Sequence, residues 1–274
     1  MANMEEQNPQ GRVLFNILFT TSVPHILEKI FFSLDYASFK KCMEVNKSWH
    51  DLLASKSFKQ IGKLAFQGEI ETALWNAVIK GIANDVRTVI SSGMVNIECT
   101  NKYATPPLGW TPLHVAASVG YHDVLEVLLE AGGNIDMETR NGEIPFHFAK
   151  DKRVAELLLD EGSHLHKEDA LRNTPLHFAS SAGHTDVVEF LLERGADPNR
   201  PNRMGETPLH IISFYTGRLG QGNVKHIAKL LIDNGADVNM VANNGGTPRT
   251  PLWFALRMGH TELADLIREN GGVE

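Results

Sequence analysis

The sequence contains few cysteines, and they are not placed for a paired site. Cys42 and Cys99 are the two cysteines among 274 residues, and no Cys-x-x-Cys spacing occurs. We therefore expect neither a disulfide framework nor a zinc knuckle, and a reducing compartment fits this composition. The expected location is cytoplasmic, with the nucleus as an alternative.

Long apolar runs are also missing. The longest one near the start, residues 13–19, is interrupted by Asn16 and is shorter than the ~20 residues that a membrane-spanning helix needs. The opening Met-Ala-Asn-Met-Glu-Glu is unlike a secretory signal, and the final Gly-Gly-Val-Glu holds no cysteine for prenylation. These features predict no membrane attachment.

Catalytic signatures are absent too. The sequence has no Gly-x-Ser-x-Gly and no His-Glu-x-x-His. Residues 217–222 open like a phosphate loop, but Asn223-Val224 replaces the Lys and Ser/Thr that would bind phosphate and magnesium. We predict a flexible loop there, no enzyme activity, no cofactor and no metal.

A basic stripe is missing from a chain whose net charge is −7. Residues 1–70 contain 8 of the 26 Lys and Arg and 7 of the 33 Asp and Glu. Residues 71–274 contain the other 18 Lys and Arg and the other 26 Asp and Glu. The longer part is thus the acidic part. Because binding to a phosphate backbone requires clustered positive charge, we do not expect a nucleic-acid partner.

What the sequence does contain is a repeated phrase, clearest in residues 173–202, NTPLHFASSAGHTDVVEFLLERGADPNRPN. Thr174 is suited to cap a helix and Pro175 to be its first residue. Gly183 is suited to end this helix in a left-handed conformation, and Gly195 to end a second, apolar helix over 186–194. A hairpin must then carry the chain to the next copy.

Copies of the phrase begin at Thr111, Ile144, Thr207 and Thr250, with steps of 33 residues from 111 to 144 and from 174 to 207. The Thr-Pro-Leu-His phrase and this period resemble the ankyrin family. The resemblance implies an all-α solenoid, because a pair of short helices cannot bury its own apolar face and must stack on its neighbours. We expect six repeats, at 72–110, 111–143, 144–173, 174–206, 207–249 and 250–274.

Three of the expected repeats are irregular. The third lacks three residues around Lys150-Asp151-Lys152-Arg153, so its first helix should be shortened. The fifth has an insertion at 216–223 between its helices and extra residues at 244–249. The last should expose a polar closing surface, as solenoid ends do; its residues are Arg257, Glu262, Asp265, Arg268 and Glu269.

Upstream of the repeats, residues 22–53 predict three short helices with a proline at the first start and apolar residues at helical spacing. This order resembles an F-box, although Val23 replaces the usual Leu. We divide the region into a polar arm at 1–12, an F-box-like unit at 13–59 and a linker at 60–71. The resemblance implies binding to a Skp-type adaptor through Val23, Pro24, Ile26, Leu27, Ile30, Leu34, Phe39, Val45 and Trp49. The alternative is that these helices only cap the first repeat.

The histidines of the phrase, His114, His147, His177 and His210, lie one repeat apart, roughly 10 Å for packed helices, which is too far to share a metal. We expect them to bond backbone groups between repeats. The ankyrin resemblance implies instead that hairpin tips and exposed first-helix positions bind a protein substrate. These positions are Arg140, Asn141, Glu143, Leu171, Asn173, Arg203, Met204, Glu206, Phe214, Tyr215, Arg257 and Met258.

Together, the two resemblances imply the substrate receptor of a Skp-cullin-F-box ubiquitin ligase, a non-catalytic monomer within a hetero-complex. Its adaptor would link it to a cullin, and its repeats would bind an unidentified protein. One alternative is an interaction scaffold without an adaptor. Another is a bacterial effector that uses the same F-box mechanism in the host cytosol.

Overall fold

A computed structural model describes residues 68, 70–100, 109–214, 221–243 and 248–274. The chain divides into two compact units, residues 1–96 and 97–274. The F-box-like unit at 13–59 lies outside the described residues, as does nearly all of the linker at 60–71. So do the predicted adaptor-binding residues Val23, Pro24, Ile26, Leu27, Ile30, Leu34, Phe39, Val45 and Trp49.

The first unit contains a helix over 70–80 and α6 (Ala83–Ser91), which confirm the helical pair expected for the first repeat. Gly81 joins them in a left-handed conformation at φ 70°. Leu74, Val78 and Val86 are fully buried. In this repeat Thr72-Ala73-Leu74-Trp75 stands in place of Thr-Pro-Leu-His, so Leu74 occupies the position of the buried leucine of the phrase.

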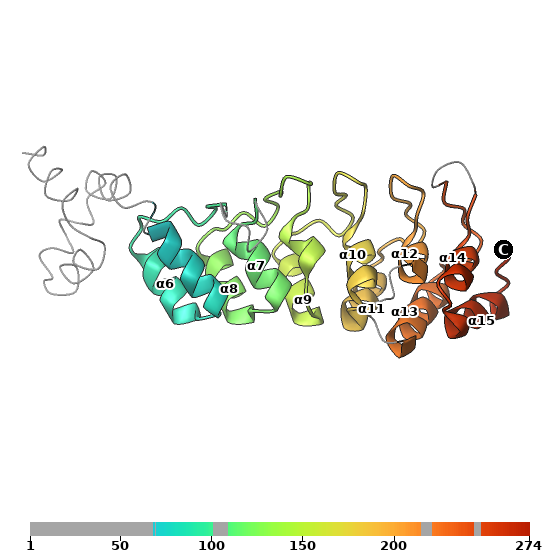
Figure 1. Cartoon of the computed structure of the whole chain (residues 1–274). Helices are drawn as coiled ribbons and strands as arrows, with labels where there is room; N and C mark the ends of the chain where they lie inside the picture. Colours follow the sequence, from blue (N-terminus) through green and yellow to red (C-terminus); the bar gives the residue numbers. More distant parts are fainter. Residues whose placement is uncertain (1–67, 69, 101–108, 215–220, 244–247) are drawn as a thin grey trace, which may run out of the picture. The chain divides into compact units, whose positions relative to one another are not determined.

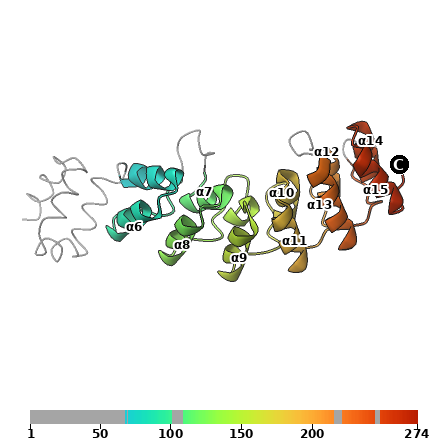
Figure 2. The same cartoon turned by 90° about the horizontal axis from the view of Figure 1, so that it is seen from below.

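The second unit contains two rows of helices (Figures 1 and 2). The first row is α7 (Pro112–Val119), the 3₁₀ helix η1 (Pro145–Phe148), α10 (Pro175–Ala182), α12 (Pro208–Phe214) and α14 (Pro251–Arg257). The second row is α8 (His122–Glu130), α9 (Lys152–Asp160), α11 (Thr185–Glu193), α13 (Gln221–Asp233) and α15 (Thr261–Glu269). Neighbours in each row pack on one another, as the stacked repeats predicted.

Local sequence explains where these helices start and stop. Every first-row element begins at a proline. The first N–H groups of a helix have no acceptor within the helix, and proline suits this position because it has no N–H. Gly183 ends α10 with φ 76°, and Gly195, after α11, has φ 88°. Both glycines therefore take the left-handed conformation that the sequence predicts for a helix end.

The chain leaves each second-row helix except α15 through a hairpin, and the hairpins project from one edge of the second unit (Figure 1). Their tips are bonded to one another through the backbone. Ala170 N–H donates to the Asn141 carbonyl at 2.7 Å, and Arg203 N–H donates to the Leu171 carbonyl at 2.8 Å. The tips therefore form one continuous edge rather than separate loops.

The irregular repeats follow their predictions in part. The first helix of the third repeat is shortened to the four residues of η1, as expected. The predicted loop at 216–223 is wrong at its end, because Gln221, Gly222 and Asn223 form the first turn of α13, which has 13 residues where α11 has nine. The last repeat exposes the polar side chains named above. Within the described ranges, no helix combines the length and apolar character needed to cross a bilayer.

The hairpin tips yield a stability prediction. Gly142, Arg172 and Gly205 hold the same tip position with φ of 81°, 64° and 78°. A Cβ at Gly142 would lie 3.1 Å from the Ala170 nitrogen. We expect Gly142→Ala to lower the free energy of unfolding by about 1–2 kcal/mol, because a side chain is unfavourable in the left-handed region.

Arg172→Gly is the matched opposite change. It removes the same conformational cost and loses only an exposed ion pair with Glu168 at 3.2 Å. We expect it to raise the free energy of unfolding by roughly 0.5 kcal/mol. Urea unfolding followed by circular dichroism measures both variants. A destabilised Arg172→Gly would show that the ion pair outweighs the backbone.

Candidate functional site

The site rests on a chain of histidine contacts between consecutive repeats. His114, His147, His177 and His210 are buried at the third position of their first-row elements. In each, Nδ1 accepts the N–H of the residue preceding the proline, at 3.1–3.2 Å. Nε2 donates to a carbonyl of the next hairpin, respectively that of Glu143 (3.2 Å), Asn173 (3.4 Å), Glu206 (3.2 Å) and Arg249 (3.3 Å).

These partners determine the protonation state of the rings. A backbone N–H can only donate and a carbonyl can only accept, so each ring must be neutral with its proton on Nε2. Burial lowers the pKa of His114, His177 and His210 to about 4, against the opposing effect of the carbonyl bonds. Burial lowers the pKa of His147 as well. The prediction that these histidines are backbone-bonding residues is confirmed.

The last repeat has Trp253 where the second to fifth repeats have histidine, and its contacts differ accordingly. Thr250 Oγ1 instead accepts from Trp253 N–H at 3.2 Å and donates to the Val273 carbonyl at 2.8 Å. The Trp253 ring lies under the Arg249 guanidinium, 4.5 Å from its centroid.

The histidines support hairpin tips that are themselves fixed by one polar side chain each. Asp169 Oδ1 accepts from the N–H groups of Leu171 and Asn173 at 2.8 and 2.7 Å. Asn202 Oδ1 accepts from Met204 and Glu206 N–H at 2.9 and 3.0 Å. Thr139 occupies the same place in the preceding tip and binds its N–H groups through Oγ1. A surface built on such tips is preorganised, which lowers the entropic cost of binding.

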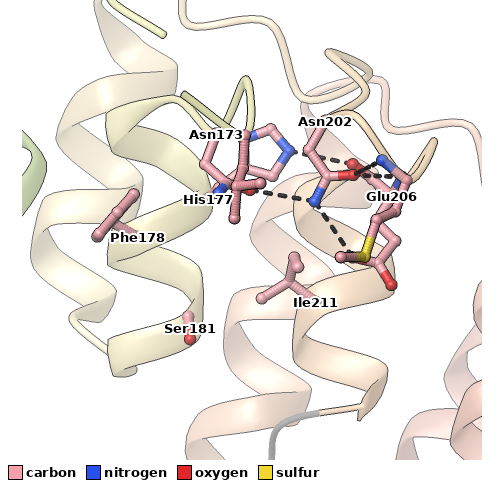
Figure 3. A pocket seen from close by; sticks show the side chains of 9 residues that line it. Asn173, His177, Phe178, Ser181, Asn202, Glu206 and Ile211 are labelled. Carbon is pink, nitrogen blue, oxygen red and sulfur yellow. Dashed lines mark hydrogen bonds between the residues drawn. The ribbon is translucent and has the colours of Figure 1, made fainter. Parts of the chain in front are cut away.

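Between two of these tips lies a pocket of about 180 Å³ (Figure 3). Leu171 and Met204 border it from the tips, and Phe178, Ser181 and Ile211 line it from α10 and α12. Leu171 is 51% exposed and Met204 43% exposed. A cavity of ~150 Å³ with apolar walls accepts benzene, so this pocket has room for one aliphatic or aromatic side chain.

A row of aromatic rings extends from this pocket toward earlier repeats. The Phe178 ring meets Phe148 edge-on at 5.4 Å, and Phe148 lies 4.5 Å from Trp110. All three side chains are half-buried. Aromatic side chains of this kind are enriched at protein interfaces. We call these rings, the pocket, the tips 139–143, 169–173 and 202–206, and the exposed ends of the first-row helices the hairpin surface.

Most of the predicted substrate-binding residues are exposed on the hairpin surface. The exposed ones are Arg140, Asn141, Leu171, Arg203, Met204, Phe214, Arg257 and Met258. Phe214 is 40% exposed, and its ring also packs edge-on against Phe254 at a centroid distance of 5.7 Å. Tyr215 lies outside the described residues.

Three predicted substrate-binding residues instead have their polar groups bonded within the tips. The Glu143 carboxylate bonds Thr139 Oγ1 and Asn141 Nδ2. Asn173 Nδ2 donates to Asp169 Oδ2 at 3.0 Å. Glu206 is buried, and its carboxylate accepts from Asn202 Nδ2 at 3.1 Å. Their place in the structure gives these three a role in holding the tips.

The histidine-rich segment 163–169 forms part of the hairpin between α9 and α10. His164 Nδ1 lies 3.0 Å from Asp136 Oδ2, and Lys167 Nζ lies 2.6 Å from Glu138 Oε1, so both side chains bond the preceding hairpin. In the part of the chain that the structure describes, no group of three or more His, Cys, Asp or Glu is placed to hold a metal ion.

Sequence reasoning missed the aromatic row and the floor of the pocket. Phe148, Phe178 and Ile211 each follow the histidine of their phrase, a position that carries a bulky side chain in every copy from the second onward. This regularity in the sequence could have predicted that these side chains share one face of the stack. Trp110 gave a weaker signal, since it directly precedes the second phrase.

Comparison with known families and proteins agrees with this geometry. Residues 51–141 match a model of three ankyrin repeats, residues 158–212 a model of many ankyrin copies, and residues 204–243 the single ankyrin repeat. The chain therefore carries ankyrin repeats. No match to an F-box family is found, and the first ankyrin match begins at residue 51, within the segment assigned to the F-box-like unit.

Two kinds of curated relative share part of this chain. An ankyrin repeat-containing protein of Schizosaccharomyces pombe is 30% identical over 82 residues, which are 30% of this chain and 37% of that protein. Protein phosphatase 1 regulatory subunit 27 of Homo sapiens is 37% identical over 73 residues, which are 27% of this chain and 44% of that protein. The chain thus spans less than half the length of each relative.

The histidines predict a pH dependence of stability. The pKa of His114, His177 and His210 is about 4 when the chain is folded and ~6.5 when it is unfolded, so the unfolded chain binds more protons between these values. The free energy of unfolding should have its highest value above pH ~6.5 and should fall as the pH drops toward ~4, by up to ~3 kcal/mol per histidine. Urea unfolding at pH 7.5, 6 and 5 measures this slope.

His177→Gln provides the control for that slope. It should lower stability already at pH 7.5, by roughly 1–3 kcal/mol, because buried backbone groups lose a partner. It should also weaken the pH dependence, since one titrating group is gone. Equal unfolding free energies for the parent chain at pH 7.5 and 5 would contradict the role assigned to the histidines.

Proposed function

We propose that this chain is a non-catalytic protein-binding module that holds a partner protein on its hairpin surface. The observation that carries the proposal is the pocket set between the bonded tips, with apolar walls from Phe178 and Ile211 and with Leu171 and Met204 exposed at its border. Large apolar side chains clustered on a surface usually mark a site of interaction. The ankyrin repeats, and the regulatory-subunit name of one relative, support a protein partner rather than a chemical reaction.

The test is a double substitution at the border of the pocket. Leu171→Ala with Met204→Ala should reduce capture of the partner from a cytosolic extract at least about tenfold, because anchors in such pockets carry much of the binding free energy. Quantitative mass spectrometry compares the parent and the variant. Val273→Ala, which truncates a 60% exposed side chain near the C-terminus, is the control and should capture as the parent does.

Unfolding curves must show that the double variant keeps its fold. Both side chains are substantially exposed, so their truncation should change stability by less than about 1 kcal/mol. Unchanged capture by a folded double variant would contradict a binding role for this pocket.

We further propose that residues 13–59 dock this module on a Skp-type adaptor of a cullin ubiquitin ligase. Support comes from the sequence order that runs from Val23-Pro24 through Leu34-Asp35 to Val45 and Trp49. A partner held on the hairpin surface would then be presented to a ubiquitin-charged enzyme in the same assembly. High effective concentration would replace a catalytic group in this chain.

Pro24→Ala with Leu34→Ala tests the adaptor proposal. The intact chain should form a stoichiometric complex with a purified Skp-type adaptor in size-exclusion chromatography. The double variant should lose this complex while its repeats still unfold at the parental urea concentration. If the intact chain binds no adaptor, it is an interaction scaffold, and the proposed binding at the hairpin surface is unaffected.

A further inference from the structure

Charge is segregated between the two rows of helices. The first-row elements α7, η1, α10, α12 and α14 contain no Asp or Glu. In the second row, α8 and α11 have acidic residues and no Lys or Arg; the acidic residues are Asp123, Glu126 and Glu130 on α8, and Asp186, Glu189 and Glu193 on α11. The net negative charge of the chain is therefore kept away from the first row.

The exposed charged side chains of the hairpin surface are all positive, opposite in sign to the net charge of the chain. Arg140, Arg172 and Arg203 lie on the tips, Lys150 follows the residue that caps the end of η1, and Arg257 ends α14. Among the described residues, no ion pair holds Arg140, Arg203, Lys150 or Arg257. Lys150 also contributes to lowering the pKa of His184, second to the burial of that ring.

Acidic residues on the entering arms of the hairpins are already engaged. Glu138 pairs with Lys167 at 2.6 Å, and Glu168 pairs with Arg200 at 2.6 Å and with Arg172 at 3.2 Å. Asp197 and Asp237 accept N–H groups of their own turns at 2.8 Å. Of the arginines at the tips, these carboxylates pair with Arg172 and leave Arg140 and Arg203 without an ion pair among the described residues.

The unpaired cations lie close to the apolar part of the surface in the fold. Arg203 stands between Asn202 and Met204, which both line the pocket. Arg140 lies one tip earlier, next to Asn141, whose carbonyl binds the tip that carries Leu171. A ligand that placed one side chain in the pocket and followed the tips would pass both arginines.

We propose that the partner presents an extended acidic segment, with Asp or Glu on both sides of one Leu, Met, Ile or Phe that occupies the pocket. This inference rests on the proposed function and names the chemistry of its partner. Carboxylates match arginine tips by bidentate hydrogen bonding, and complementary charge raises both specificity and the rate of association. A strongly basic segment would be repelled by the same tips.

A single-stranded nucleic acid would also supply negative charge, but the surface favours a polypeptide. Leu171, Phe178, Met204 and Ile211 give the pocket its apolar walls beside the polar groups of the tips, and it holds one side chain rather than a run of stacked bases. Edge-on packing of Phe148 against Phe178 leaves less open ring face than a stacking platform requires.

The experiment pans a display library of random 12-residue peptides against the full chain and sequences the bound fraction. We expect enrichment of Asp and Glu around a single large apolar residue. Arg140→Glu with Arg203→Glu should reverse this preference toward Lys and Arg, and should weaken an enriched acidic peptide at least about tenfold. Lys225→Glu with Lys229→Glu on α13 changes the net charge equally on the second row and should leave the acidic preference intact.

The outcomes separate this inference from the proposed function. Enriched peptides that need Leu171 and Met204 but show no acidic bias would overturn the acidic partner and leave the binding surface standing. Enriched peptides that ignore both the arginines and the pocket would overturn both, as would the absence of any enrichment. Equal or tighter binding of a labelled 12-nucleotide oligouridine at the arginine tips would assign the surface to nucleic acid instead.

Discussion

The bond from a neutral histidine to the carbonyl of the next hairpin is the constraint on which the second unit depends. Each ring takes one N–H from its own repeat through Nδ1 and gives one hydrogen to the following repeat through Nε2. Each ring thereby fixes the position of one hairpin relative to the next. The tips are then close enough for Ala170 and Arg203 to bond the preceding tip, and the pocket between Leu171 and Met204 is a consequence of that spacing. A buried polar side chain, that of His177, thus positions a binding pocket that it also helps to line.

Much of this arrangement could be predicted from the sequence, because the repeated phrase combines a helix start, a helix stop and a buried histidine at fixed spacing. The shortening of η1 followed from a deletion, and the polar end of the last repeat followed from solenoid physics. The origin of α13 could not be predicted in the same way. Gln221 to Asn223 contains a glycine and reads as a loop, yet these residues extend a helix whose remainder is already held by packing, which overrides weak local propensity.

The candidate site was predictable to a lesser degree, since sequence position does not reveal which way a polar group turns. Leu171 and Met204 were found because they share a tip position, and both border the pocket. Glu206 lies on the same tip, two residues after Met204, but its carboxylate turns inward and accepts a hydrogen bond from Asn202. The charge segregation is likewise visible only when the helices are sorted into rows, because along the sequence the acidic helices and the basic tips follow one another. A surface of opposite sign to its own protein emerges from that sorting.

The third repeat has a mechanical consequence. Its first element is one 3₁₀ turn, its phrase begins with Ile144 in place of threonine, and its histidine makes the longest of the four carbonyl bonds, at 3.4 Å. In a solenoid each joint contributes its own share of cohesion. Under tension along the stack, this joint would part before its neighbours, so that the array would separate into two shorter pieces at η1 instead of fraying inward from its C-terminal end.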